Sequence, residues 1–155
     1  MNWVTCGTYL DRLVCVTGLL SLEEFCTDAN LSSSLLLTCF EDRNTCDEEF
    51  LTFLDKVVPL CPLSLSVSGV FAASYFDSMI VYLDKINVKC QIMTRFNDST
   101  ELECWLMELF QATWPAEENF NLWSRYSIVV VGSKVFQEQM FSTTARFMDV
   151  KEGCK

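Results

Sequence analysis

Histidine is absent from this sequence of 155 residues, and glycine and proline are scarce, with five and three residues. Without histidine, Ser-His-Asp and Cys-His mechanisms are excluded, and the commonest general base is missing. Few glycines and prolines, with 50% hydrophobic residues, also exclude the composition of disordered chains. We therefore expect a single folded domain over residues 1–155, with one sizeable core.

Basic residues are also few, since 11 Lys and Arg stand against 21 Asp and Glu, which gives a formal net charge of -10. Such a chain repels phosphate backbones and anionic membranes, so we expect neither nucleic acid nor a membrane as a partner. The same charge favours a basic protein as partner. No apolar run reaches the roughly 18 residues that a membrane span needs, so the sequence predicts a soluble protein.

Cysteine, in contrast, is abundant. The nine cysteines are Cys6, Cys15, Cys26, Cys39, Cys46, Cys61, Cys90, Cys104 and Cys154. They include no C-x-x-C pair, and no histidine can complete a zinc site, so we expect no metal and no other cofactor. A secretory signal is not expected, because Asp11 and Arg12 interrupt the first apolar stretch. We therefore predict a cytoplasmic protein whose thiols are free and mostly buried.

From Ser33 onward, short strand-like runs alternate with segments of helical period. The pattern predicts strands at 34–40, 63–69, 89–96 and 126–132, and helices at 47–58, 72–83, 99–113 and 134–148. Because strands joined by helices pair in parallel through right-handed crossovers, helices should cover both faces of the sheet. We predict an α/β three-layer sandwich with a mostly parallel sheet of four or more strands.

Residues 1–30 are less regular than the rest. Apolar spacing there favours a helical addition to the domain, on the positions Leu10, Leu13, Val14, Thr17 and Leu20.

Two of the predicted helices also begin with residues that are typical of helix caps. Thr45 and Glu48 match a capping box before helix 47–58, and Asp98 and Glu101 are expected to cap helix 99–113.

None of the loops after the predicted strands completes a catalytic motif. The run from Gly132 to Lys134 lacks the first glycine and the spacer of a phosphate loop. Cys90 and Arg95 are separated by four residues, one fewer than in the similar thiolate phosphatase loop, so the arginine would miss the phosphate. We therefore predict no catalytic residue and no enzymatic activity.

Acidic side chains follow two of the predicted strands. Glu41 and Asp42 come after strand 34–40, and Asp98 and Glu101 come after strand 89–96. Because parallel strands end at the same edge of a sheet, where ligands bind in this fold class, these four acids should share one edge. We predict that they bind a partner.

The connector between helix 99–113 and strand 126–132 carries two further acids, Glu117 and Glu118, between two tryptophans. We expect Trp114 and Trp123 to anchor this connector in the core and to hold the glutamates outward. Adjacent acids could also work as an acid–base pair, but a solvated face is the commoner arrangement. Glu117 and Glu118 therefore complete the predicted partner-binding set.

A small acidic α/β chain without a catalytic signature resembles the immunity proteins that neutralise interbacterial toxins, including those of contact-dependent inhibition. The resemblance lies in the character of the whole chain and implies an inhibitor that blocks the active site of a cognate, basic, nuclease-type toxin. Two alternatives stay open. One is an enzyme or small-molecule-binding domain that uses the carboxyl edge of the sheet, and the other is a structural or regulatory subunit whose amino-terminal segment mediates oligomerisation. The sequence leaves the oligomeric state unknown.

Overall fold

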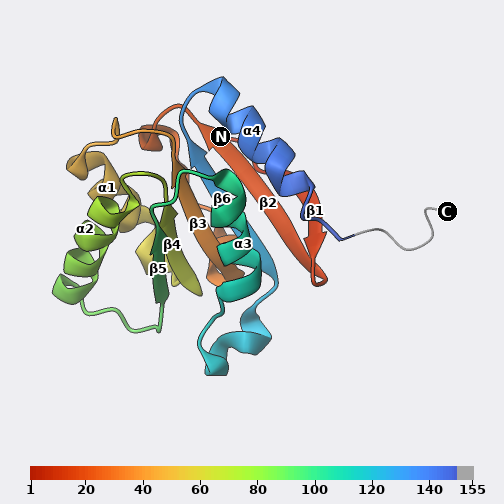
Figure 1. The fold of residues 1–155 in the computed structure, drawn as a ribbon. Coiled ribbons are helices and arrows are strands. Elements are labelled where there is room, and N and C mark those ends of the chain that lie inside the picture. The colour runs from red at the N-terminus through yellow and green to blue at the C-terminus, as the bar shows by residue number, and fades with distance from the viewer. Residues whose placement is uncertain (150–155) are drawn as a thin grey trace.

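The computed structural model describes residues 1–149 and contains one sheet of six strands in the order β1-β2-β6-β3-β4-β5 (Figure 1). The strands are β1 Val4–Tyr9, β2 Arg12–Leu19, β3 Ser34–Phe40, β4 Ser64–Ser68, β5 Met93–Asn97 and β6 Arg125–Val131. Neighbouring strands are parallel except β1, which pairs with β2 in the antiparallel sense. The prediction of a mostly parallel sheet is confirmed.

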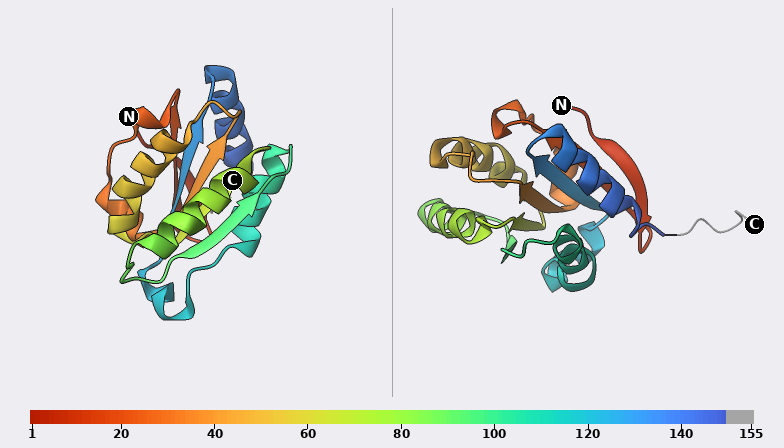
Figure 2. Two further views of the ribbon diagram at one scale, coloured as in Figure 1. Left: turned by 90° about the vertical axis from the view of Figure 1, so that its left-hand side faces the viewer. Right: turned by 45° about the horizontal axis from the view of Figure 1, so that its top comes forward.

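Helices cover both faces of the sheet (Figure 2). The helices are α1 Asp47–Val57, α2 Ala72–Lys85, α3 Leu102–Ala112 and α4 Lys134–Ala145, with short 3-10 turns η1 Leu22–Glu24, η2 Ala29–Ser33, η3 Val58–Leu60 and η4 Glu117–Leu122. One apolar core lies between the sheet and the α1–α2 pair, and a second lies between the sheet and the α3–α4 pair. The architecture is the predicted three-layer sandwich.

Strands β3, β4 and β6 lie at or next to the centre of the sheet, and every one of their residues is buried. A strand covered on both faces gains stability from apolar residues at every position, which explains the continuous runs of leucine in β3 and valine in β6. The predicted helical faces are also buried for the most part. An exception is Val135, which was expected to point inward from α4 and is instead 64% exposed.

The prediction of a helix within residues 1–30 is wrong, because this segment forms the β1–β2 hairpin. The tight turn places Leu10 and Asp11 in the left-handed region, with φ of 47° and 64°. β2 then pairs with β6 from Leu13 to Leu19. The β-branched residues of β2 suit this neighbour, and pairing with a buried strand overrides an apolar spacing that fits a helix equally well.

The helix caps also differ from the predictions. α1 begins after Cys46, so Thr45 lies one position too early to cap it, and its carbonyl oxygen instead accepts a hydrogen bond from the Tyr75 hydroxyl at 2.9 Å. α3 begins after Glu101, whose backbone N–H donates to Ser99 Oγ at 3.1 Å. The helix that does have a side-chain cap is α4, where the Ser133 hydroxyl accepts from a backbone N–H of the first turn.

The prediction of free thiols is wrong for one pair of the described cysteines, and the prediction that the thiols are mostly buried is wrong. Cys61 and Cys90 form a disulfide with a Cα–Cα distance of 6.0 Å. They precede β4 and β5, and because these strands are parallel neighbours, their starting points lie side by side. The free cysteines within 1–149 are the buried Cys15 and Cys39, the half-buried Cys6 and Cys104, and the exposed Cys26 and Cys46. Cys154 lies outside the described residues.

Tyr126 is fully buried in β6, and its hydroxyl oxygen lacks a hydrogen-bond partner among residues 1–149. Burial raises the pKa of Tyr126 to about 12. An unfolded tyrosine titrates near pH 10, so this group favours folding below about pH 10 and loses that contribution as the pH rises towards about 12.

Replacing Tyr126 by phenylalanine is therefore expected to flatten the loss of stability at alkaline pH. At neutral pH the free energy of unfolding should change by less than about 1 kcal/mol, because the hydroxyl that is removed makes no hydrogen bond. Urea denaturation of both proteins across the alkaline range measures the effect. An unchanged alkaline slope would mean that Tyr126 titrates as an exposed tyrosine does.

Candidate functional site

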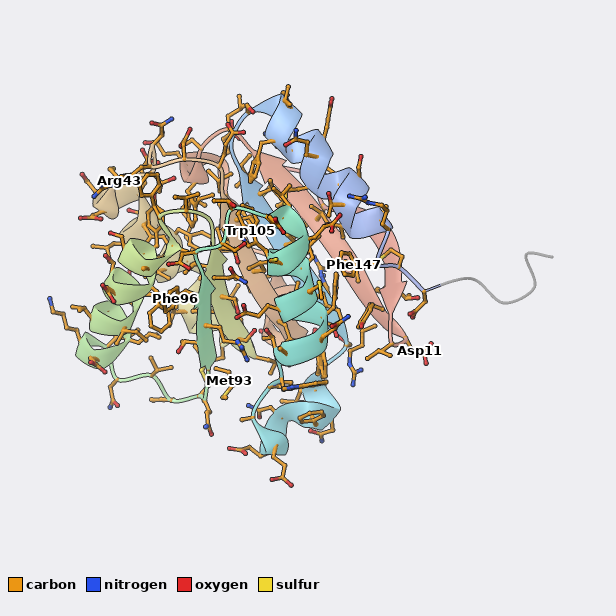
Figure 3. All side chains as sticks on the ribbon, viewed as in Figure 1. Asp11, Arg43, Met93, Phe96, Trp105 and Phe147 are labelled. Carbon is orange, nitrogen blue, oxygen red and sulfur yellow. A yellow bond between two sulfur atoms is a disulfide. The ribbon has the colours of Figure 1, made fainter. Side chains whose placement is uncertain are left out.

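The parallel strands all end at one edge of the sheet, which we call the carboxyl edge. It consists of 20–21 after β2, 41–46 after β3, 69–71 after β4, 98–101 after β5 and 132–133 after β6. Figure 3 shows the labelled Arg43 at this end of the molecule and Asp11, in the β1–β2 turn, at the other. Four of the predicted partner-binding acids, Glu41, Asp42, Asp98 and Glu101, fall within the carboxyl edge as the topology predicted.

Glu41 joins the loop after β3 to the beginning of α4. Its carboxylate accepts hydrogen bonds from the Ser133 hydroxyl at 2.8 Å and from the Ser133 backbone N–H at 3.3 Å. The backbone N–H of Glu41 in turn donates to the Val131 carbonyl oxygen at 3.0 Å. A carboxylate at the amino end of a helix is stabilised by the helix dipole, so Glu41 is held in a fixed position.

The rest of this loop is also braced. Asp42 accepts hydrogen bonds from the backbone N–H and the side-chain amide of Asn44, at 2.9 and 2.8 Å. The Tyr75 hydroxyl donates a hydrogen bond to the Thr45 carbonyl oxygen, and burial raises the pKa of Tyr75 above its ordinary value. The acids after β3 are therefore preorganised for binding.

A cavity of about 330 Å³ opens beside Glu41. It lies at the ends of the neighbouring strands β3 and β6, whose following helices α1 and α4 cover opposite faces of the sheet. Ligands commonly bind at such a point of an α/β sheet. Its lining residues come from the loops after β2, β3 and β6 and from α1. The polar ones are Ser21, Glu41, Asp42, Asn44, Thr45, Glu49 and Ser133. The carboxylates give this cavity an acidic character suited to a cationic group.

Between the acids after β3 and those after β5, the loop after β4 presents two apolar side chains to solvent. Val70 is 52% exposed and Phe71 is 38% exposed. The guanidinium carbon of Arg43 lies 5.5 Å from the centre of the Phe71 ring. Asp98 and Glu101, on the far side of this loop, are both exposed. The carboxyl edge thus has an apolar centre between two acidic flanks, a feature that the sequence interpretation missed.

Gly69 shapes the loop that carries Val70 and Phe71. It has a φ of 137°, and a Cβ there would lie 2.5 Å from the Phe40 carbonyl oxygen. Its N–H donates to the Asn97 carbonyl oxygen at 3.0 Å, which ties the loop to β5. Both the conformation and the close approach require glycine.

Gly69→Ala is therefore expected to lower the free energy of unfolding by about 2 kcal/mol or more, since it combines backbone strain with a steric clash. Ser74→Ala, at an exposed position of α2, is the control and should change it by less than about 0.5 kcal/mol. Urea denaturation monitored by circular dichroism compares the two. Equal stability of the two variants would contradict the described conformation of Gly69.

Glu117 and Glu118 do not lie with the other four acids. They begin η4, which precedes β6, and so they lie at the opposite, amino edge of the sheet. Trp123 is buried, which confirms its predicted role as an anchor. The same prediction for Trp114 is wrong, because this side chain is 46% exposed. Both glutamates are exposed, as expected.

Residues 1–149 contain no group of three or more cysteines, aspartates and glutamates that could hold a metal ion. The Ser133 hydroxyl donates to Glu41 and accepts from the Phe136 N–H, so it serves to cap α4.

Within residues 1–149, no helix is long and apolar enough to cross a membrane. Comparisons with protein-family models, curated proteins and solved structures found no match.

Proposed function

We propose that this protein is an inhibitory binding protein that engages a basic partner protein through its carboxyl edge. The observation that carries the proposal is the placement of exposed Val70 and Phe71 between two groups of acids. Interfaces combine an apolar centre that loses its water with a polar rim that sets orientation. The carboxyl edge has this composition, with acids as its rim.

Charge supports a basic partner in two ways. The net charge of -10 attracts a basic protein at long range and raises the association rate. At short range, the contact of Arg43 with the Phe71 ring illustrates that this ring face accepts a guanidinium group. A partner's arginine or lysine can replace Arg43 on this face while its neighbours pair with Asp42, Asp98 or Glu101.

The form of this function that fits best is that of an immunity protein, which neutralises a cognate toxin by covering its active site. A nuclease binds its substrate in a basic groove, because it must neutralise phosphates. An acidic edge with fixed carboxylates can occupy such a groove in place of nucleic acid. No catalytic residue of the inhibitor is needed for this mode of action.

A second candidate function is the binding of a small cationic molecule, and the cavity beside Glu41 is the observation that favours it. The cavity lies at the carboxyl ends of the neighbouring strands β3 and β6, which is the usual position of a ligand site in this fold class. Thermal denaturation with a panel of amines and nucleotides separates the two candidates. Saturable stabilisation by one compound would favour the ligand-binding function over the protein-binding one.

The compartment remains part of the proposal. We place the protein in the cytoplasm, as the sequence predicts, and the exposed thiols of Cys26 and Cys46 support this. The disulfide between Cys61 and Cys90 is more typical of an oxidising compartment. Alkylation of thiols in intact cells, followed by mass spectrometry, distinguishes the two compartments. If Cys61 and Cys90 do not react with the reagent, a reducing cytoplasm is contradicted.

Selection of displayed random peptides tests the partner's chemistry without knowledge of its identity. We expect peptides selected on the wild-type protein to be rich in Lys and Arg next to an apolar residue. They should not bind a carboxyl-edge variant that carries Asp42→Asn, Phe71→Ser, Asp98→Asn and Glu101→Gln. Neutral or acidic peptides, or equal binding to the variant, would overturn the proposal.

A further inference from the structure

The amino edge of the sheet carries an exposed cluster of apolar side chains. The amino-edge patch consists of Trp114, Phe120 and Leu122, which are 46%, 42% and 54% exposed, with Glu117 and Glu118 beside them. Large aromatic side chains are seldom left this exposed on a monomer, and clusters of them mark interaction sites. Tryptophan is also among the residues that contribute most to binding energy.

The patch is rigid. The Trp114 and Phe120 rings stack with their centres 6.5 Å apart, and both meet the buried Trp123 edge to face, at 6.1 and 5.7 Å. Trp123 in turn packs on Tyr126 of the central strand β6 at 5.5 Å. Because the exposed rings rest on the core, little conformational entropy is lost when a partner covers them.

The charge beside the patch is negative. Glu117 and Glu118 are exposed, and the segment 96–124 contains no lysine or arginine. Arg12, from the β1–β2 hairpin, is already engaged: its guanidinium carbon lies 3.6 Å from the centre of the Trp123 ring, and its Nε donates to the Trp123 carbonyl oxygen at 3.2 Å. Arg12 keeps its single charge in these contacts, so the two glutamates leave a partner a surface with a net negative charge.

We propose that the amino-edge patch is a second docking surface, which binds a basic amphipathic segment of a partner protein. Apolar side chains of the segment cover Trp114, Phe120 and Leu122, and its lysines or arginines pair with Glu117 and Glu118. A second copy of this chain is a poorer occupant, because pairing around a two-fold axis brings four glutamates together. An anionic membrane is repelled by the same charges.

This surface is separate from the one in the proposed function and does not depend on it. The seven residues of β6 lie between the two edges, which corresponds to roughly 20 Å along the sheet. One segment seated on the patch therefore leaves the carboxyl edge free. The protein can hold two basic segments at once, from one large partner or from two.

The test uses three synthetic amphipathic helices that share a leucine face and carry lysine, glutamate or serine on the other face. They are titrated into the carboxyl-edge variant defined above, so that the first surface does not contribute. Tryptophan fluorescence follows binding, because Trp114 is the most exposed of the four tryptophans: Trp3 is half-buried, and Trp105 and Trp123 are buried. We expect saturable binding of the lysine helix and a blue shift of the emission.

Two variants are made in this background. Trp114→Ser, and the charge reversal Glu117→Lys with Glu118→Lys, should each weaken binding of the lysine helix by about tenfold or more. The melting temperature of the charge-reversal protein should stay close to that of the parent, because both glutamates are exposed. Trp114→Ser should lower it modestly, because the Trp114 ring packs on Phe120 and Trp123. Binding to the two variants is measured by calorimetry, which does not depend on Trp114. Leu122→Ser serves as a further variant if one of the others fails to fold.

Four results would overturn the proposal: no saturable binding of the lysine helix, equal binding of the glutamate helix, unchanged affinity in the folded variants, or a patch-dependent dimer in sedimentation. A blue shift with phospholipid vesicles that Trp114→Ser abolishes would assign the patch to a membrane instead. Failure at this patch leaves the carboxyl edge untested, so the two proposals stand or fall separately.

Discussion

Replacing both Cys61 and Cys90 by serine is expected to lower the free energy of unfolding by about 3 kcal/mol. The disulfide closes a loop over a sequence separation of 29 residues, which contains β4 and α2. Without it, the unfolded chain gains the entropy of opening that loop, while the folded core keeps its contacts. Urea denaturation under non-reducing conditions measures the difference.

The control for this prediction is Cys26→Ser, which changes a free and exposed thiol. It should alter the free energy of unfolding by less than about 0.5 kcal/mol. A reductant should destabilise the wild-type protein and Cys26→Ser alike, but not the Cys61→Ser, Cys90→Ser protein. If reductant has no effect on the wild type, the two thiols are not linked in the purified protein.

Val70→Ser together with Phe71→Ser is expected to weaken binding of a selected basic peptide by about thirtyfold or more. A central apolar residue of an interface contributes about 2 kcal/mol or more, which corresponds to that factor. Neither side chain belongs to the buried core, so folding should be retained. Calorimetric titration of the peptide into both proteins measures the change.

Val81→Ser is the matched control for this pair. Val81 is 52% exposed, as is Val70, but it lies on α2 away from the carboxyl edge. Its replacement should leave the affinity within about twofold. Equal losses in the control and the carboxyl-edge pair would mean that general surface hydrophobicity, and not this site, drives binding.

The parts of the fold that sequence patterns predict well are those whose pattern fits one structure alone. The three successive valines of β6 fit a strand alone. The apolar face of α3 around Trp105 and Leu106 fits a helix alone. The β1–β2 hairpin could not be predicted in this way, because its apolar spacing also fits a helix. Pairing of β2 with β6 decides between them, and this contact joins residues more than a hundred positions apart.

The candidate site was predictable in part for a similar reason. Acids that directly follow parallel strands share an edge by topology, which correctly placed Glu41 and Asp98 at the same edge of the sheet. The exposure of Phe71 and Trp114 was not predictable, because an aromatic residue at the end of an element packs inward or outward according to its tertiary neighbours. The pairing of Cys61 with Cys90 likewise follows from the adjacency of β4 and β5, not from their spacing.

The dependence of binding on salt tests the central claim, that the acids of the carboxyl edge bind a basic partner, most directly. The dissociation constant of a selected peptide is measured at rising ionic strength, for the wild type and for a protein with Asp42→Asn, Asp98→Asn and Glu101→Gln. We predict that the affinity of the wild type falls steeply with salt, and that the variant binds more weakly with a much shallower dependence. An affinity that does not change with salt, or the same dependence on ionic strength in both proteins, would contradict the claim.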